Sequence, residues 1–283
     1  DTMLNEKSFF VLLILLSYAE LVQSQLNENL LQNIENREKV SLDGDWRIIV
    51  DPLENGYYNH RYLPKEDGYF KNKKMKSPSD LIEYDFDTDG TLKVPGDWNT
   101  QGDKYYYYEG TIWYKKSFDY NLAQNEVTYL YFEAVNYEAK VYLNGEYLGD
   151  HQGGYTPFQF DVTGRLKEKD NFIVVKVDNK RLKDAIPTVN SDWWNYGGIT
   201  RSVHLISLPK SHIKDYSIQL SADRSSIKGE FLVQGQTEND KVSLSIPELK
   251  KKIELKVDEK GMASFKIKAK PEFWTPENPK RYH

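Results

Sequence analysis

The densest concentration of side chains able to do chemistry lies at residues 190–201, which read NSDWWNYGGITR. Two adjacent tryptophans, a tyrosine and an asparagine stand between an aspartate and a pair of glycines. Aromatic faces stack on the apolar faces of a sugar ring, and the carboxylate of Asp192 or the amide of Asn195 can pair with hydroxyl groups that are costly to bury unpaired. This mixture indicates a carbohydrate-binding loop.

The same residues also have a purely structural interpretation. Trp193, Trp194 and Tyr196 could fill a core, and the glycine pair could form a turn. Asp192 could then form an ion pair with Arg201. Composition alone favours this second interpretation, because large aromatic residues are more often buried than used for binding.

Three further blocks of sequence bear on that choice. They read VPGDW at 94–98, GTIWYKKSF at 110–118, and NG at 144–145 followed by HQGGYTPF at 151–158 and DVT at 161–163. Together with DWWNYGGITR they resemble, in the same order, the signatures of glycoside hydrolase family 2. HQGGYTPF and the 192–201 segment are most similar to the β-glucuronidases of that family. The likeness extends from about residue 38 to the C-terminus.

This resemblance implies roles for particular residues. It places Asp192 where a carboxylate of the first domain binds hydroxyls of the sugar at the non-reducing end. Asp97 lies where some β-galactosidases of the family place a polar residue that contacts substrate. The residues expected to hold the loop are Trp193, Trp194, Asn195, Tyr196 and Arg201, together with Trp98 and Trp113.

Composition excludes several other kinds of site. The chain has 283 residues and no cysteine, so it has neither disulfides nor thiolate metal sites and depends on burial for its stability. Its five histidines are scattered, and we expect no metal and no cofactor. A net charge of -5 gives no indication of a basic surface that would bind nucleic acid. The expected partner is a carbohydrate.

The N-terminal segment has the pattern of a secretory signal. Met3 is the expected start, and the apolar run from Phe9 to Leu16 is too short to span a bilayer. We therefore expect a cleaved signal peptide at 1–24 rather than an uncleaved anchor, followed by a polar leader at 25–39. The predicted location is secreted or periplasmic, with no membrane attachment after cleavage.

Short alternating segments bounded by Gly, Asn and Asp recur from residue 40 onward, with no long amphipathic helix among them. They predict an all-β chain in which a jelly-roll β-sandwich at 40–208 precedes a second sandwich at 209–283. The resemblance implies that this second part is an incomplete immunoglobulin-like domain. Within the first domain, Trp46 is a predicted core residue and Asn144-Gly145 a two-residue hairpin turn. The long polar stretch at 51–89 either shapes a binding rim or has no role.

Catalytic residues are not assigned. Retaining glycoside hydrolysis needs two carboxyl groups about 5 to 5.5 Å apart, and the family carries both on a following (β/α)₈ barrel. The Asn27-Glu28 and Asn125-Glu126 dipeptides have the sequence of the family's acid/base motif but not its structural context. The first lies in the leader, and the second is at the start of a predicted strand of the sandwich.

The expected function is that of the non-catalytic N-terminal portion of a secreted retaining exo-β-glycosidase, most similar to β-glucuronidase. A β-galactosidase of the same family is the alternative specificity, and a stand-alone carbohydrate-binding protein is the alternative class. The resemblance also admits a homo-oligomer of the full-length enzyme.

Overall fold

The computed structural model describes residues 30–65, 68–70, 77–79, 84–122, 126–235, 237 and 240–283. The predicted signal peptide and the first five residues of the predicted leader lie outside this part, as do parts of the 51–89 stretch. The described chain forms two compact units, Asn33–Lys210 and Ser211–His283, the latter joined by residues 30–32. No helix among the described residues is long and apolar enough to cross a membrane.

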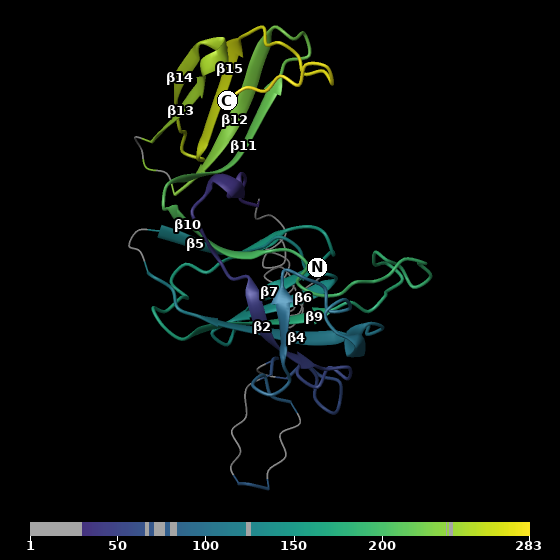
Figure 1. The fold of residues 1–283 in the computed structure, drawn as a ribbon. Helices are drawn as coiled ribbons and strands as arrows, with labels where there is room; N and C mark the ends of the chain where they lie inside the picture. Colours follow the sequence, from purple (N-terminus) through teal and green to yellow (C-terminus); the bar gives the residue numbers. More distant parts are fainter. Residues whose placement is uncertain are drawn as a thin grey trace, which may run out of the picture. The chain divides into compact units, whose positions relative to one another are not determined.

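The first unit is a sandwich of two antiparallel sheets (Figure 1). One sheet has, in spatial order, β3 (Thr91–Val94), β2 (Gly44–Val50), β4 (Thr111–Phe118), β9 (Asn171–Asp178), β6 (Glu138–Leu143) and β7 (Glu146–Gln152). The other has β1 (Lys39–Ser41), β10 (Val203–Pro209), β5 (Glu126–Phe132) and β8 (Phe158–Asp161). The jelly-roll prediction is confirmed.

The main core of this unit is formed by side chains from both sheets. Trp46 of β2 is fully buried in it, as predicted, and its indole nitrogen donates to the carbonyl of Leu42 at 2.9 Å. On β4, Ile112 and Tyr114 belong to this core, whereas Trp113 between them belongs to a different cluster. This is the alternation that a pleated strand imposes on successive side chains.

That second cluster lies on the outer face of the six-stranded sheet and involves the 51–89 stretch. Trp113 packs against Phe70 with ring centroids 5.5 Å apart, and its indole nitrogen donates to Asp51 Oδ2 at 2.9 Å. Phe86 is buried in the same cluster, and Tyr57 packs against it. The described residues of the 51–89 stretch therefore cover the outer face of the sheet.

The predicted hairpin turn is confirmed. Asn144 and Gly145 have φ values of 52° and 93° and connect β6 to β7, with Leu143 paired opposite Glu146. Positive φ at both central positions is what a two-residue turn of this type requires.

The second unit is also a β-sandwich. Its strands are β11 (His212–Leu220), β12 (Ser226–Gln234) and β15 (Met262–Lys268) in one sheet, and β13 (Lys241–Ile246) with β14 (Lys251–Lys256) in the other. Its own core contains Phe231, Val242 and Phe265. Helical segments of the described chain are three-residue 3₁₀ turns: η1 (Ile34–Asn36), η2 (Asp103–Tyr105) and η3 (Pro247–Leu249). The all-β prediction is confirmed.

Candidate carbohydrate-binding loop

Residues 190–201 connect β9 to β10 and contain no regular secondary structure beyond a single bridge between Gly198 and Asn136. A loop of this kind cannot satisfy its backbone groups by a ladder of sheet hydrogen bonds. Isolated backbone hydrogen bonds, such as those from Trp98 to Gly197 and from Gly96 to Ile199, hold its second half, and side chains from neighbouring segments supply further contacts.

Four buried asparagines supply most of those contacts, and we call them the asparagine bracket: Asn99, Asn136, Asn179 and Asn195. The side-chain amide of Asn179 donates to the carbonyl of Asn195 at 2.8 Å, and Asn136 Nδ2 donates to Asn195 Oδ1 at 3.2 Å. Asn99 Oδ1 accepts from the backbone N–H of Gly197 at 3.0 Å. Since buried amides without partners are costly, these hydrogen bonds make the bracket a specific brace for the loop.

The bracket also ties the loop to the segments that carry the other sequence motifs. Asn99 Nδ2 donates to the carbonyls of Tyr105, Tyr106 and Tyr108 at 3.0, 3.2 and 3.1 Å. Asn179 Oδ1 accepts from the backbone N–H of Gly110 at 2.8 Å. The structure thus brings the 94–98, 110–118 and 192–201 motifs together at the end of the sandwich.

The glycine pair of the loop allows the loop backbone to lie close to the 96–98 segment. A Cβ on Gly197 would lie 2.1 Å from the indole ring of Trp98 and 2.6 Å from Asn179 Nδ2. Gly198 has a φ of 139°, and a Cβ there would lie 2.8 Å from the carbonyl oxygen of Gly96. Only residues without a side chain fit between the loop and the 96–98 segment.

Arg181 fixes the backbone on both sides of Asp192. Its guanidinium donates to the carbonyl of Ser191 at 2.7 Å and to the carbonyl of Trp193 at 3.1 Å. The same guanidinium forms an ion pair with Glu109 at 3.0 Å. The position of Asp192 is therefore fixed through its neighbours' carbonyl groups, without use of its own side chain.

The side chain of Asp192 is exposed. Within the described part of the chain, neither the Asp192 carboxylate nor the Arg201 guanidinium takes part in a side-chain hydrogen bond or an ion pair, so the alternative ion pair between them is not formed. A carboxylate held in place in this way keeps both oxygens available as acceptors for hydroxyl groups.

Exposed aromatic rings gather around Trp194, two residues after Asp192, and form what we call the aromatic platform: Tyr106, Tyr107, Trp194 and Tyr196. The ring of Trp194 lies 4.9 Å from that of Tyr106, 5.5 Å from that of Tyr107 and 6.3 Å from that of Tyr196. Clustered rings that remain exposed are the kind of surface on which a sugar ring can stack.

Asp97 is in a different situation. Its Oδ1 accepts from the backbone N–H of Thr100 at 2.8 Å and its Oδ2 from the hydroxyl of Thr100 at 3.0 Å. Both oxygens thus stabilise the turn in which the residue stands. Its predicted contact with substrate remains a prediction.

Two tyrosines beneath the loop are held in the neutral form. Burial raises the pKa of Tyr114, which is fully enclosed, and the negative charge of Asp97 acts in the same direction. Burial likewise raises the pKa of Tyr108, whose hydroxyl donates to the carbonyl of Thr111 at 2.8 Å. Both phenols therefore serve as neutral groups rather than as proton acceptors.

The predicted loop scaffold is realised only in part. Asn195 and Trp98 are buried in it, but Trp193, Trp194 and Tyr196 are 56%, 37% and 47% exposed, and the Arg201 side chain is exposed as well. Trp113 does not brace the loop, because strand alternation places it on the outer face of the sheet.

Several residues that support or adjoin the loop were not predicted from the sequence, namely Asn99, Asn136, Asn179, Arg181, Tyr106 and Tyr107. The run of four tyrosines at 105–108, directly before the GTIWY motif, was a usable signal for the platform. The asparagines and Arg181 carry no comparable local pattern.

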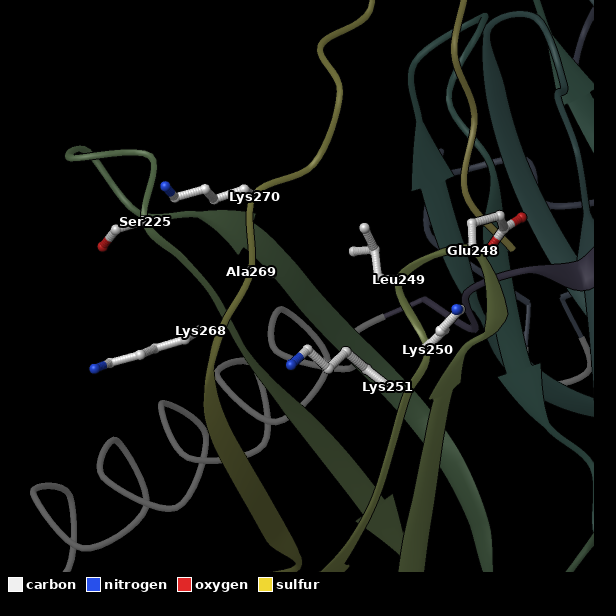
Figure 2. A pocket seen from close by; sticks show the side chains of 8 residues that line it. All are labelled: Ser225, Glu248, Leu249, Lys250, Lys251, Lys268, Ala269 and Lys270. Carbon is white, nitrogen blue, oxygen red and sulfur yellow. The ribbon is translucent and has the colours of Figure 1, made fainter.

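The described residues contain neither a cluster of metal ligands nor a focused basic site. No group of three or more His, Cys, Asp or Glu side chains there could hold a metal ion. The second unit has a hollow of about 740 Å³ lined by Lys250, Lys251, Lys268 and Lys270 (Figure 2). Their ammonium groups are spread around the hollow rather than directed at one point, which is typical of a solvated basic face (Figure 2).

The fold and the loop together define a β-sandwich module that presents a fixed acidic and aromatic loop at one end. A model of the glycosyl hydrolases family 2 sugar binding domain matches residues 40–209, which is more than half of the chain. The chain belongs to glycoside hydrolase family 2.

Individual relatives carry both specificities of the family. A β-glucuronidase of Formosa agariphila is 39% identical over 114 residues, which are 38% of this chain and 12% of that protein. A β-galactosidase of Priestia megaterium is 27% identical over 225 residues, which are 71% of this chain and 21% of that protein.

Solved structures show the same fold. The β-glucuronidase of Bifidobacterium dentium, determined with coumarin-3-O-glucuronide, matches with a TM-score of 0.65 and 23% identity over 87% of this chain and 44% of that one. This chain therefore spans less than half the length of these relatives.

Proposed function

We propose that the chain is the N-terminal, non-catalytic portion of a retaining exo-β-glycosidase and that Asp192 binds hydroxyl groups of the sugar at the non-reducing end. One observation carries this proposal: the Asp192 carboxylate is exposed and unpaired within the described chain, although Arg181 holds the carbonyls on both sides of it. Fixed acceptors of this kind bind ligands with little loss of conformational freedom.

The aromatic platform supports a carbohydrate as the ligand, since a loop that carries both exposed rings and a free carboxylate can combine stacking with hydrogen bonding. β-Glucuronidase is the proposed specificity, supported by the HQGGYTPF and DWWNYGGITR motifs. The β-galactosidase alternative is favoured by the longer alignment with the relative from Priestia megaterium.

The first test is the nucleotide sequence downstream of the His283 codon. An open frame of roughly 300 codons that encodes a barrel, with an Asn-Glu pair at a strand end and a second glutamate, would support the enzyme. A stop codon there would favour the stand-alone binding protein, which glycan-binding assays on the chain would then examine.

The second test uses the protein so encoded. We expect Asp192→Ala to lower kcat/KM by roughly 30- to 150-fold, the equivalent of about 2 to 3 kcal/mol for a lost hydrogen bond to a charged group. Rates with aryl β-glucuronide and aryl β-galactoside would be compared in parallel, which also assigns specificity. An unchanged kcat/KM on the preferred substrate would refute the role of Asp192.

We propose in addition that the protein is exported. The apolar run from Phe9 to Leu16 supports this, because it has the length of a signal-peptide core. N-terminal sequencing of the protein recovered outside the cytoplasm should begin near residue 25. Recovery of the intact N-terminus inside the cell would contradict the proposal.

A further inference from the structure

The outer face of the six-stranded sheet contains a cavity of about 260 Å³ that is separate from the 190–201 loop. Lys140 of β6 and Lys176 of β9 contribute to its lining from the sheet. Tyr57 and Tyr58, from the 51–89 stretch, and Leu182, from the segment after β9, contribute from outside the sheet. One of the two interpretations left open for 51–89, that it shapes a binding rim, thus has a specific location.

The charged groups of this cavity compensate one another. Lys176 pairs with Glu54 at 2.6 Å. Lys180 pairs with Glu54 at 2.9 Å and with Asp178 at 3.2 Å. A lining in which ammonium groups and carboxylates are interleaved in this way has little attraction for an ion of either sign.

Glu54 and Lys140 remain charged around neutral pH. Burial opposes ionisation of Glu54, but its hydrogen bonds with Lys176 and Lys180 outweigh that effect and lower its pKa. Burial likewise opposes the charge of Lys140, yet Glu138, 3.4 Å away, and Asp150 raise its pKa. The cavity therefore presents strong donors and strong acceptors side by side, as the adjacent hydroxyls of a sugar ring require.

Tyrosine rings supply the apolar part of the lining. Tyr57 and Tyr58 meet edge to face with centroids 4.7 Å apart. The ammonium groups of Lys140 and Lys176 lie 5.4 and 5.7 Å from the centre of the Tyr57 ring. The rings and the charged groups thus face the same small space.

We propose that this cavity is an ancillary binding site for one neutral sugar ring, distinct from the Asp192 loop. Its volume lies below the range of about 300 to 1,000 Å³ typical of sites for drug-sized ligands, which suits a single ring. Compensated charges select a neutral polyol over a phosphate or a metal ion, and the tyrosines provide faces for its C–H groups. This site does not depend on the activity proposed above.

The test is a titration of the full chain with methyl β-D-glucoside, methyl β-D-galactoside and methyl β-D-glucuronide. Binding at the cavity is measured as chemical-shift changes in the NMR signals of residues 54–58 and of β9. We expect at least one neutral glycoside to bind more tightly than the glucuronide. The key variant is Leu182→Arg, which places a long side chain at the rim of the cavity and should weaken binding at least tenfold. Leu122→Arg is the matched control, because both leucines are exposed, at 43% and 46%, and Leu122 does not line the cavity.

Two further variants keep the test decisive. Lys140→Met retains the aliphatic part of the side chain but removes a donor, so it should also weaken binding, with the melting temperature as a check on folding. Asp192→Ala should leave the sugar-induced NMR chemical-shift changes at the cavity unchanged. Absence of binding by the wild-type chain, equal binding by Leu182→Arg, or loss of the shifts in Asp192→Ala would each overturn the proposal.

Discussion

Asp97 and Asp192 lie on neighbouring segments, yet their carboxylates are used in opposite ways. The two segments are joined by backbone hydrogen bonds from Trp98 to Gly197 at 2.8 Å and from Gly96 to Ile199 at 2.9 Å. Asp97 directs both oxygens to Thr100 in its own turn. Asp192 makes no such bond within the described chain, and Arg181 holds its neighbours' carbonyls instead.

This difference separates a stabilising residue from a candidate binding residue. A carboxylate whose acceptor sites are already filled contributes to folding and has less capacity left for a ligand. A carboxylate whose backbone is fixed by other groups can be positioned and still remain free. The comparison therefore predicts that substitutions beneath the loop affect stability, whereas substitution of Asp192 affects binding alone.

The largest effect on stability is expected at Trp98, which lies where the two segments meet. Trp98 is fully buried, and its indole nitrogen donates to the carbonyl of Tyr108 at 3.1 Å. Trp98→Ala should lower the free energy of unfolding by about 3 to 5 kcal/mol, because it creates a large cavity. Denaturant unfolding would measure this, with the exposed Trp193→Ala as control. Similar stabilities of the two variants would contradict the burial of Trp98.

A smaller effect is expected from filling the space beneath the loop. In Gly197→Ala the added methyl group would meet the Trp98 ring, and overpacking of this kind costs about 1 to 3 kcal/mol. Gly102→Ala is the matched control. Gly102 has an extended backbone with a φ of 168°, and a Cβ added there would lie 3.5 Å from the Tyr105 ring, which is an ordinary van der Waals contact. Equal melting temperatures of the two variants would show that the loop is not closely packed on Trp98.

A more modest loss of stability is expected when the side chain of Asp97 is removed. Asp97→Ala removes both bonds to Thr100 and should cost about 1 kcal/mol, as does the loss of a side-chain cap at the start of a turn of helix. Asp97→Asn keeps an oxygen that can accept the backbone N–H of Thr100, so most of the stability should return. Thermal unfolding of both variants checks this. If Asp97→Ala melts like the wild type but loses sugar binding, Asp97 belongs with Asp192 as a binding residue.

Much of the fold could be predicted from the sequence, because alternation and turn residues are local signals. The alternating segments from residue 40 onward form the strands of both sandwiches, and the Asn144-Gly145 turn lies where it was predicted. The β3 strand was not predicted, since its four residues give only a short alternating signal. Strand order within the sheets is not encoded locally, and the structure supplies it.

The site was predicted less completely, and the reasons differ by residue. Asp97 and Thr100 are three positions apart, so their bond had a local signal. The asparagine bracket joins positions 99, 136, 179 and 195, which only the sheet topology brings together. Exposure of Trp194 could not be inferred, because an irregular loop has no period from which to assign inward and outward faces.

The smallest effect on stability, and the most informative, is expected at Asp192 itself. Asp192→Ala should change the free energy of unfolding by less than about 0.5 kcal/mol, because the side chain is exposed and Arg181 still holds the loop. Arg181→Ala should by contrast weaken binding without removing the carboxylate, since it frees the carbonyls of Ser191 and Trp193. Comparing the two variants by thermal unfolding and by sugar titration separates the carboxylate from its support. Substantial destabilisation by Asp192→Ala would mean that this carboxylate, like that of Asp97, serves the fold.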